Sequence, residues 1–339
     1  MQTMRAVLLT GHGGLDQLEY RQDVPVPVPR ADEVLIEVHA CGVNNTDINT
    51  RTGWYNGSWG GGLTFPRIQG ADPIGRIAAI GASVDPARVG QRVLVDAWLR
   101  FVDGDLEKAG YLGSERDGGY AEYVTVPSSN AHPIQTDLTD VELASLPCSH
   151  ATAEHMLHRP NVSSGQWVLV TGASGGVGSA LIQLAKRRKA NVVAVTSEPK
   201  IEEVRRLGAD VVLDRAVVDL DQAVLGATGG IDVFADVVGG DLFPGLFGTI
   251  RRGGHYTTAG AIGGAVVSLD LRTLYLRDIT MHGATVLPSE VFANLVAYIE
   301  RGEITPIVAG TFPLEEIKKA QEAFMTKEHV GNLVIEVLP

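Results

Sequence analysis

A glycine-rich stretch in the middle of the chain restricts the fold more than any other feature. Residues 168–178 read Val-Leu-Val-Thr-Gly-Ala-Ser-Gly-Gly-Val-Gly, and they join an apolar run typical of a buried strand to a segment with the period of an amphipathic helix. Glycines in this setting permit a tight turn and let the backbone approach a pyrophosphate at the positive end of the helix. The stretch predicts a dinucleotide-binding βαβ unit.

The residues of this loop follow the dinucleotide pattern with one departure, since Ala173 stands where the first glycine is usual. A turn that only packs a helix onto a sheet and binds nothing is the alternative interpretation. Under the binding interpretation, the residues expected around the pyrophosphate are Ala173, Ser174, Gly175, Gly176, Val177 and Gly178.

The organisation of the chain changes near residue 140. Before it, apolar residues alternate with polar ones, as at Val34, Ile36 and Val38, and turns are frequent, which is typical of β structure. After a helical stretch at 137–159, with Asp137 or Thr139 as its cap, apolar strands alternate with helices. That alternation predicts an α/β fold with a parallel sheet. The mixed tail is expected to pack back on the N-terminal part.

Charge and cysteine content exclude several classes of protein. The chain has 339 residues with a formal charge of −12, which argues against a nucleic-acid surface. Its two cysteines, Cys41 and Cys148, exclude a disulfide framework and favour a reducing compartment. No secretory signal or run of 18 apolar residues is present, so we expect a cytoplasmic protein with no membrane span.

The end of the second strand of the βαβ unit bears on the choice of cofactor. An NAD site usually carries an acid there, but the strand at 191–195 is followed by Thr196. Ser197, Lys200 and Arg215 are suited to bind a 2′-phosphate, which predicts NADPH. Two alternatives stay open: Glu198 binds the ribose hydroxyls of NADH, or the two cations are merely solvated.

Several further motifs, taken in order, extend along nearly the whole chain. They are Cys41-Gly-Val-Asn-Asn-Thr-Asp47, Gly70-Ala-Asp-Pro-Ile-Gly75, Asp117-Gly-Gly-Tyr-Ala-Glu-Tyr-Val124, the glycine loop, Ile231-Asp-Val-Phe-Ala-Asp-Val-Val-Gly-Gly240 and Gly331-Asn-Leu-Val334. With them the chain resembles the medium-chain dehydrogenase/reductase superfamily, and within it the zinc-free quinone oxidoreductases and enoyl reductases. The resemblance implies a GroES-like β-rich catalytic domain (1–147 and 287–339) and a Rossmann doubly wound parallel-sheet domain (148–286), with a substrate cleft between them.

The resemblance also bears on metal binding. The superfamily's alcohol dehydrogenases hold a catalytic zinc with Cys, His and a third residue, but these positions here fall on Asn44, Ala71 and Cys148. Asp72 follows Ala71, and residues 96–118, where a structural zinc lobe would lie, contain no cysteine. One thiolate and one carboxylate do not make a zinc site, so we expect no metal. We then expect both cysteines to be small buried apolar residues. His150 and His155 are expected to be structural, and assistance to a metal by these two histidines is the alternative.

Without a metal, conjugate reduction is easier than alcohol oxidation, because the developing enolate oxygen needs only hydrogen-bond donors. The resemblance places Asn44 and Tyr55 at the catalytic site, Asn44 as a donor and Tyr55 as a substrate-positioning or proton-relaying group. Tyr55 stacking on a loop is the alternative, and Asp72 is expected to accept backbone N–H groups. The resemblance further assigns residues to the cofactor beyond the loop: Thr152, Gly260, Ala261, Thr285, Val286 and Asn332.

Three functions remain open at this stage. The first is an NADPH-dependent reductase of a small quinone or enone, whose pocket is shaped by loops 53–66 and 96–118. The second is an alcohol dehydrogenase with an atypical metal site, and the third is an NADPH-binding sensor without turnover. The apolar strand expected at 279–286 resembles an edge through which this superfamily pairs subunits, so we expect a homodimer first and a tetramer second.

Overall fold

The computed structural model describes residues 2–55, 63–100 and 108–338. Its chain divides into two compact units, Met1–Cys148 with Phe292–Pro339, and Ser149–Val291. The sequence placed the two divisions after residues 147 and 286. Both divisions in the structure lie inside helices, α3 (Pro147–His158) and α9 (Ser289–Glu300). The helical pattern of the sequence continues across each division, so the sequence alone does not indicate where the units are divided.

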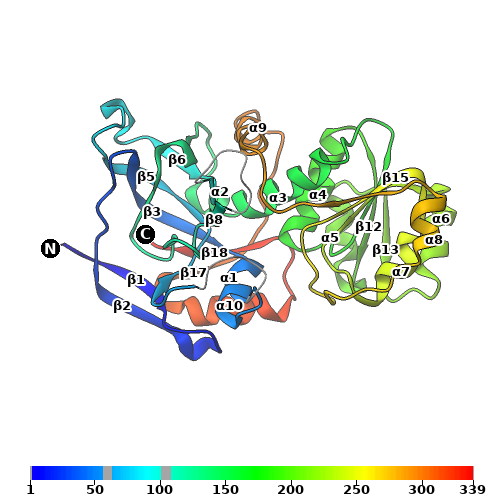
Figure 1. Cartoon of the computed structure of the whole chain (residues 1–339), viewed down its shortest axis with the longest axis horizontal. Helices are drawn as coiled ribbons and strands as arrows, with labels where there is room; N and C mark the ends of the chain where they lie inside the picture. Colours follow the sequence, from blue (N-terminus) through cyan, green and yellow to red (C-terminus); the bar gives the residue numbers. More distant parts are fainter. Residues whose placement is uncertain (1, 56–62, 101–107, 339) are drawn as a thin grey trace. The chain divides into compact units, whose positions relative to one another are not determined.

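The first unit is built mainly on antiparallel strands, labelled in Figure 1. Its largest sheet has the order β10-β6-β5-β3-β18-β17, with β9 also pairing with β3. The C-terminal β18 pairs antiparallel with β3 and parallel with β17, so the tail of the chain completes the N-terminal sheet. The strands of this sheet are β3 (Glu33–Val43), β5 (Asp72–Ile80), β6 (Arg92–Val95), β9 (Tyr123–Pro127), β10 (Ala131–Pro133), β17 (Val308–Pro313) and β18 (Asn332–Glu336).

Smaller sheets and short helices complete the first unit. One sheet has the order β2-β1-β4, and β7 pairs antiparallel with β8, which ends at Tyr111. The elements are β1 (Thr3–Leu9), β2 (Leu18–Pro25), β4 (Arg67–Ile68), β7 (Trp98–Arg100), β8 (Ala109–Tyr111), α1 (Asn45–Thr52), α2 (Asp140–Ala144) and α10 (Ile317–Thr326).

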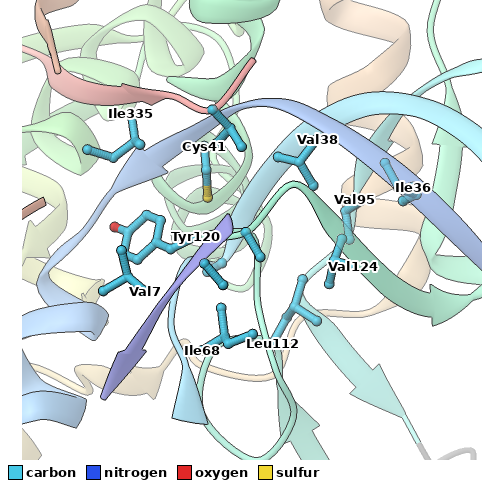
Figure 2. Packing of buried hydrophobic residues seen from close by; sticks show 14 of the residues in the cluster. Val7, Ile36, Val38, Cys41, Ile68, Val95, Leu112, Tyr120, Val124 and Ile335 are labelled. Atoms are coloured by element: carbon cyan, nitrogen blue, oxygen red, sulfur yellow. The ribbon is translucent and has the colours of Figure 1, made fainter. Parts of the chain in front are cut away.

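The core of the first unit lies where β1, β3 and the segment around Tyr120 meet (Figure 2). Cys41, Tyr120 and Ile335 come from distant parts of the sequence and are fully buried there. Each large apolar side chain removed from water in this way contributes roughly 1.5–3 kcal/mol. Cys41 is therefore the small buried apolar residue that the sequence predicted, whereas Cys148, for which the same was predicted, is only half-buried.

The second unit contains a sheet of six parallel strands in the order β13-β12-β11-β14-β15-β16. From β11 the chain moves outward to β12 and β13, then crosses to β14 and continues outward to β15 and β16. The doubly wound parallel sheet expected from the sequence is confirmed. The strands are β11 (Trp167–Val170), β12 (Asn191–Thr196), β13 (Val211–Asp214), β14 (Ile231–Asp236), β15 (Ile250–Thr258) and β16 (Thr280–Gly283).

Helices follow the strands of this sheet (Figure 1). They are α4 (Gly176–Arg187), α5 (Ile201–Arg206), α6 (Leu220–Thr228), α7 (Phe243–Phe247) and α8 (Leu271–Leu276). The apolar face of α4, with Leu181 and Leu184, is buried because these residues recur at helical spacing. In the described ranges, no helix has both the length and the apolar character needed to cross a bilayer.

Two elements differ from the sequence predictions. The helix predicted at 137–159 is broken into α2 and α3, because Pro147 has no N–H to continue the ladder. Thr139 caps α2 by accepting a hydrogen bond from Glu142 N at 3.2 Å. The strand predicted at 279–286 covers only Thr280–Gly283, because its neighbour β15 ends at Thr258, which pairs with Gly283.

Candidate active site

The glycine loop lies at the carboxyl end of β11 and leads directly into α4. Gly175 is the N-cap residue of α4, and the helix begins at Gly176. Gly172 has a φ of +59°, and a Cβ on Gly178 would lie 2.1 Å from the carbonyl oxygen of Gly172. No other residue fits at position 178, so the loop is pressed against the first turn of the helix. The N–H groups of that first turn have no partner within the helix, which suits them to an anion.

The side of the sheet expected to receive the adenosine is formed by the ends of β12 and β13. Arg215 N donates a hydrogen bond to Thr196 O at 2.7 Å, so the two strand ends are joined there. Ser197 follows β12 and is half-buried, and Lys200 ends a short 3-10 helix, Glu198–Lys200. The structure thus brings the backbones of the residues assigned to a 2′-phosphate to one edge.

A second glycine-rich feature, absent from the sequence predictions as a site, lies at the ends of β14 and β15. The turn 237–240 is hydrogen-bonded to the turn 261–264, through Gly263 N to Val238 O (2.8 Å) and Gly240 N to Gly264 O (3.1 Å). A Cβ on Gly239 would lie 2.5 Å from Gly264 O, so these turns can approach only as glycines. Gly260 and Ala261 lie at the start of this pair of turns and are half-buried. In the sequence, the glycine pairs at 239–240 and 263–264 are the signal from which this feature could have been predicted.

The other residues assigned to the cofactor fall at separate places. In the second unit, Thr152 lies half-buried in α3, while Thr285 and Val286 follow β16 rather than forming part of it. Asn332 begins β18 in the first unit and is 5% exposed. Its Nδ2 atom is buried and has no hydrogen-bond partner in the described part of the chain. A buried amide of this kind is costly unless a ligand or water satisfies it.

Asn44 stands at the start of α1, where the sequence predicted a catalytic donor. Its backbone N–H donates to Asp47 Oδ2 at 2.8 Å, which fixes the beginning of the helix. Its side-chain Nδ2 donates to Asp72 Oδ2 at 2.9 Å, and Cys148 N donates to Asp72 Oδ1, also at 2.9 Å. Asp72 therefore accepts the hydrogen bonds that the sequence predicted for it, and it gains a side-chain donor as well.

Burial of Asp72 shapes the electrostatics of this region. The carboxyl group is 2% exposed, and burial raises its pKa to about 7, against the hydrogen bond from Asn44. The neighbouring charge of Asp47 raises the pKa of Asp72 further. Burial also raises the pKa of Asp47 to about 6, although Asp47 accepts hydrogen bonds from Tyr120 and Gly70. Burial therefore moves the titration of both carboxyl groups toward neutral pH.

Tyr111 joins the same group of residues, and the sequence analysis did not name it. Its hydroxyl lies 3.4 Å from Cys148 Sγ, and its ring packs on Trp98 with centroids 4.8 Å apart. Burial raises the pKa of the Tyr111 hydroxyl. No motif marks Tyr111, because it lies at the end of a short strand next to a loop. Asn44, Asp72, Tyr111 and Cys148 are called the Asp72 cluster below.

Tyr55 follows α1 and is half-buried. Its hydroxyl accepts a hydrogen bond from Asn49 Nδ2 at 3.1 Å. Burial raises the pKa of the Tyr55 hydroxyl against the hydrogen bond from Asn49, and the neighbouring Cys148, Asp47 and Glu115 raise it further. The parts of the pocket loops that lie at 56–62 and 101–107 are outside the described residues.

The side chains of the Asp72 cluster include residues at positions that the resemblance assigned to zinc ligands. Positions 44 and 148, which the resemblance assigned to zinc ligands, both contact Asp72, and Ala71 beside it is buried. Over residues 2–55, 63–100 and 108–338, no three or more His, Cys, Asp or Glu side chains are gathered in a way that suits a metal ion. His155, in α3, is held neutral because burial lowers its pKa to about 4, and His150 Nδ1 lies 3.0 Å from Ser149 Oγ.

The Asp72 cluster can donate a hydrogen bond to a developing negative charge. A primary amide has two N–H donors, and one N–H of Asn44 is used on Asp72. The second N–H and the carboxamide plane are oriented by that contact. Such an oriented donor is what an oxyanion requires.

Comparison with known proteins matches both parts of the chain to domains of the same group of dehydrogenases. Residues 30–136 match the alcohol dehydrogenase GroES-like domain, and residues 176–301 match the zinc-binding dehydrogenase domain. A crystal structure from Sinorhizobium meliloti 1021, assigned provisionally as an alcohol dehydrogenase, is 50% identical with a TM-score of 0.94, covering 99% of this chain and 97% of that one.

Two curated relatives are named for reductase activities. The quinone oxidoreductase of Mus musculus is 28% identical, over 94% of this chain and 93% of its own length. The NADPH-dependent alkenal/one oxidoreductase of Arabidopsis thaliana is also 28% identical, over 99% of this chain and 80% of its own length.

Proposed function

The chain belongs to the medium-chain dehydrogenase/reductase superfamily, and we propose that it is an NADPH-dependent reductase of quinones or α,β-unsaturated carbonyl compounds that needs no metal ion. One observation carries the proposal: the side-chain amide of Asn44 is held by the buried carboxyl group of Asp72. The resemblance assigns this position to a zinc ligand in the zinc-dependent members. Relatives named for quinone and alkenal reduction support the same substrate class.

The residues present fit a dinucleotide. A Cβ at Gly178 would collide with the loop, so the backbone can be pressed closely around a pyrophosphate at Gly175–Gly178. Ser197, Lys200 and Arg215 would hold the 2′-phosphate. Thr152, Gly260, Ala261, Thr285, Val286 and the unsatisfied amide of Asn332 would meet the nicotinamide end. When bound, NADPH supplies a hydride.

The residues of the first unit act on the substrate. The free N–H of Asn44 donates to the carbonyl oxygen of an enone or quinone and stabilises the charge that develops there. Asp72 keeps the amide in the donating orientation. Tyr55 positions the substrate or delivers the proton that completes the reduction, with water as the other source.

Alcohol dehydrogenase activity is the second candidate function, and two of the comparisons favour it. The 50% identical structure is provisionally an alcohol dehydrogenase, and the matching domain is described as zinc-binding. Cys148 and Asp72 would then supply a thiolate and a carboxylate to an atypical metal site. An NADPH-binding sensor without turnover is the third candidate.

The experiment that separates these functions measures NADPH consumption with quinones, short enones, enoyl thioesters and aldehydes, together with the zinc content of the purified chain. We expect turnover of a quinone or an enone, no stoichiometric zinc, and activity that survives a chelator. One tightly bound zinc per chain, with activity lost on its removal, would replace this proposal by the dehydrogenase. Tight NADPH binding with no turnover of any acceptor would favour the sensor.

A further inference from the structure

Asp236, the last residue of β14, lies at the centre of a hydrogen-bond network that the proposed function does not use. Its Oδ1 accepts from Thr171 Oγ1 at 2.5 Å and from Val238 N at 2.8 Å. Its Oδ2 accepts from Tyr256 OH at 3.0 Å, and Gly239 N lies 3.1 and 3.2 Å from the two oxygens. One carboxylate thus joins the ends of β11, β14 and β15.

Because this carboxyl group is buried, the hydrogen-bond donors around it must all point toward it. Asp236 is 1% exposed, and an ionised carboxylate can only accept hydrogen bonds. A buried charge is costly unless donors satisfy it, so each of the surrounding donors is held toward the same point. The network therefore sets the relative positions of three strand ends.

The network lies at the part of the sheet where doubly wound folds bind their ligands. Strand order reverses between β11 and β14, and in doubly wound sheets ligands bind outside the carboxyl ends of the strands at this reversal. The hydrogen bond from Thr171 to Asp236 spans these two strand ends. Thr171 directly precedes Gly172, the first glycine of the loop, and a Cβ on Gly172 would lie 3.0 Å from a methyl group of Val237.

The same carboxylate also sets the second glycine feature. Val238 N and Gly239 N, which it binds, begin the turn 237–240 that is hydrogen-bonded to residues 261–264. Movement of Asp236 would consequently shift both the pyrophosphate loop and the turn beside Gly260. In the described part of the chain, the hydrogen-bond partners of Asp236 are Thr171, Val238, Gly239 and Tyr256, and none of them lies at the ends of β12 and β13, on the adenosine side.

We propose that Asp236 is a positioning residue for the dinucleotide, which sets the spacing between the glycine loop and the turn 237–240 without touching the adenosine half of the ligand. The inference rests on the proposed function, since it requires a dinucleotide at the carboxyl ends of the strands. It assigns to one buried side chain a role in the affinity for the pyrophosphate and nicotinamide halves alone.

The test compares two ligands in Asp236→Asn by isothermal titration calorimetry. One ligand is whichever of NADPH and NADH the parent chain binds more tightly, and the other is its adenosine fragment without the 5′-phosphate, adenosine 2′-monophosphate for NADPH or adenosine for NADH. The amide sets an N–H against the donors at Thr171, Val238 or Gly239, so the whole dinucleotide should bind about 10- to 100-fold more weakly. The affinity for the fragment should stay within about twofold of the parent.

Asp232→Asn is the matched control. Asp232 lies in the same strand and accepts a hydrogen bond from Trp167 N at 2.7 Å, so it joins the same two strands at their opposite ends. A loss of stability alone should affect both variants, whereas only Asp236→Asn should weaken the dinucleotide. Thr171→Val removes just the link between β11 and β14, and it serves if Asp236→Asn does not fold. It should also weaken the dinucleotide and spare the fragment.

The outcomes separate this inference from the proposed function. Parent-like dinucleotide affinity in both Asp236→Asn and Thr171→Val would overturn the inference alone, and so would a parallel loss of dinucleotide and fragment affinity. A parent chain that binds neither NADPH nor NADH would overturn the proposed function and the inference with it.

Discussion

The side-chain amide of Asn44 donates a 2.9 Å hydrogen bond to the buried carboxyl group of Asp72. Asn44 is the N-cap residue of α1 and Asp72 begins β5, so the contact joins two elements whose polar residues face one another only in the folded chain. It leaves one N–H of the amide for another acceptor. The ability of Asn44 to donate a hydrogen bond to a substrate should therefore depend on its contact with Asp72.

Substitution of Asn44 should affect turnover more than substrate binding. Asn44→Ala is expected to lower kcat by roughly 10²-fold, in the range for losing one oxyanion donor. Asn44→Asp should be worse, because it sets a second carboxylate against Asp72 and against the developing charge. Steady-state kinetics with the best acceptor of the NADPH-consumption screen measure both effects. An unchanged kcat in Asn44→Ala would remove Asn44 from the catalytic site.

Tyr55→Phe separates proton delivery from packing, because the ring remains. If the hydroxyl delivers the proton, kcat should fall by roughly 10²–10⁴-fold. Tyr111→Phe is the comparison, since its hydroxyl contacts Cys148 Sγ and the proposed reaction does not use it. A parent-like kcat in Tyr55→Phe would leave water as the proton donor and make Tyr55 a wall of the pocket.

Cofactor choice should follow charge at the ends of β12 and β13. Lys200→Ala and Arg215→Ala should each weaken NADPH binding by ~1–3 kcal/mol, the cost of losing a charge-assisted hydrogen bond. NADH binding should hardly change, because NADH has no 2′-phosphate. Fluorescence titration of both cofactors measures the difference. Equal affinity of the parent chain for NADPH and NADH would contradict the assignment of these residues.

The buried carboxyl group of Asp72 should make stability fall as the pH rises. Its pKa is raised in the folded state to about 7, whereas an unfolded aspartate titrates near its ordinary value of 3.8. The stabilisation is therefore fully present below the unfolded pKa and is lost as the pH rises through about 7. Denaturant unfolding between pH 4 and 8, around these two pKa values, should show the loss in the parent chain.

Asp72→Asn is the control for this pH dependence, because the amide does not titrate. The variant should be less stable at low pH, since one of its contacts to Asn44 and Cys148 is weakened, but its free energy of unfolding should vary less with pH. A parent and variant with parallel pH profiles would show that Asp72 keeps an ordinary pKa in the folded chain.

Self-association is expected through the outer edge of the second unit. In the sheet as described, β16 pairs on one side with β15, Met281 within β16 is exposed, and the segment that leads into β16 exposes Val266 (94% exposed), Leu271 and Tyr275. Unpaired apolar edges favour association with a second copy. Analytical ultracentrifugation should show a homodimer, or else a tetramer, and Tyr275→Lys should weaken it. A parent chain that stays monomeric at all concentrations would count against this edge.

The dinucleotide fold could be predicted from the sequence because its signals are local. In residues 168–178 the strand, the turn and the helix start follow one another, and each glycine acts within a few residues of its place in the chain. The alternation of strands and helices after residue 140 likewise predicted the parallel sheet. The sequence also marked Asn44 and Asp72 as polar residues of interest, through the resemblance of their motifs.

What joins these residues was decided by the tertiary structure. Asp72 at the start of β5 meets Asn44 and Cys148, which lie far from it in the sequence, and Tyr111 reaches Cys148 from the short strand β8, which no motif marks. Asp236 gathers Thr171 and Tyr256 in the same way, across three strands. Hydrophobic periodicity specifies which face of an element is buried, but it does not specify which polar groups meet when distant elements pack. Those meetings set the burial and the hydrogen bonds, and so the pKa values and orientations on which the chemistry depends.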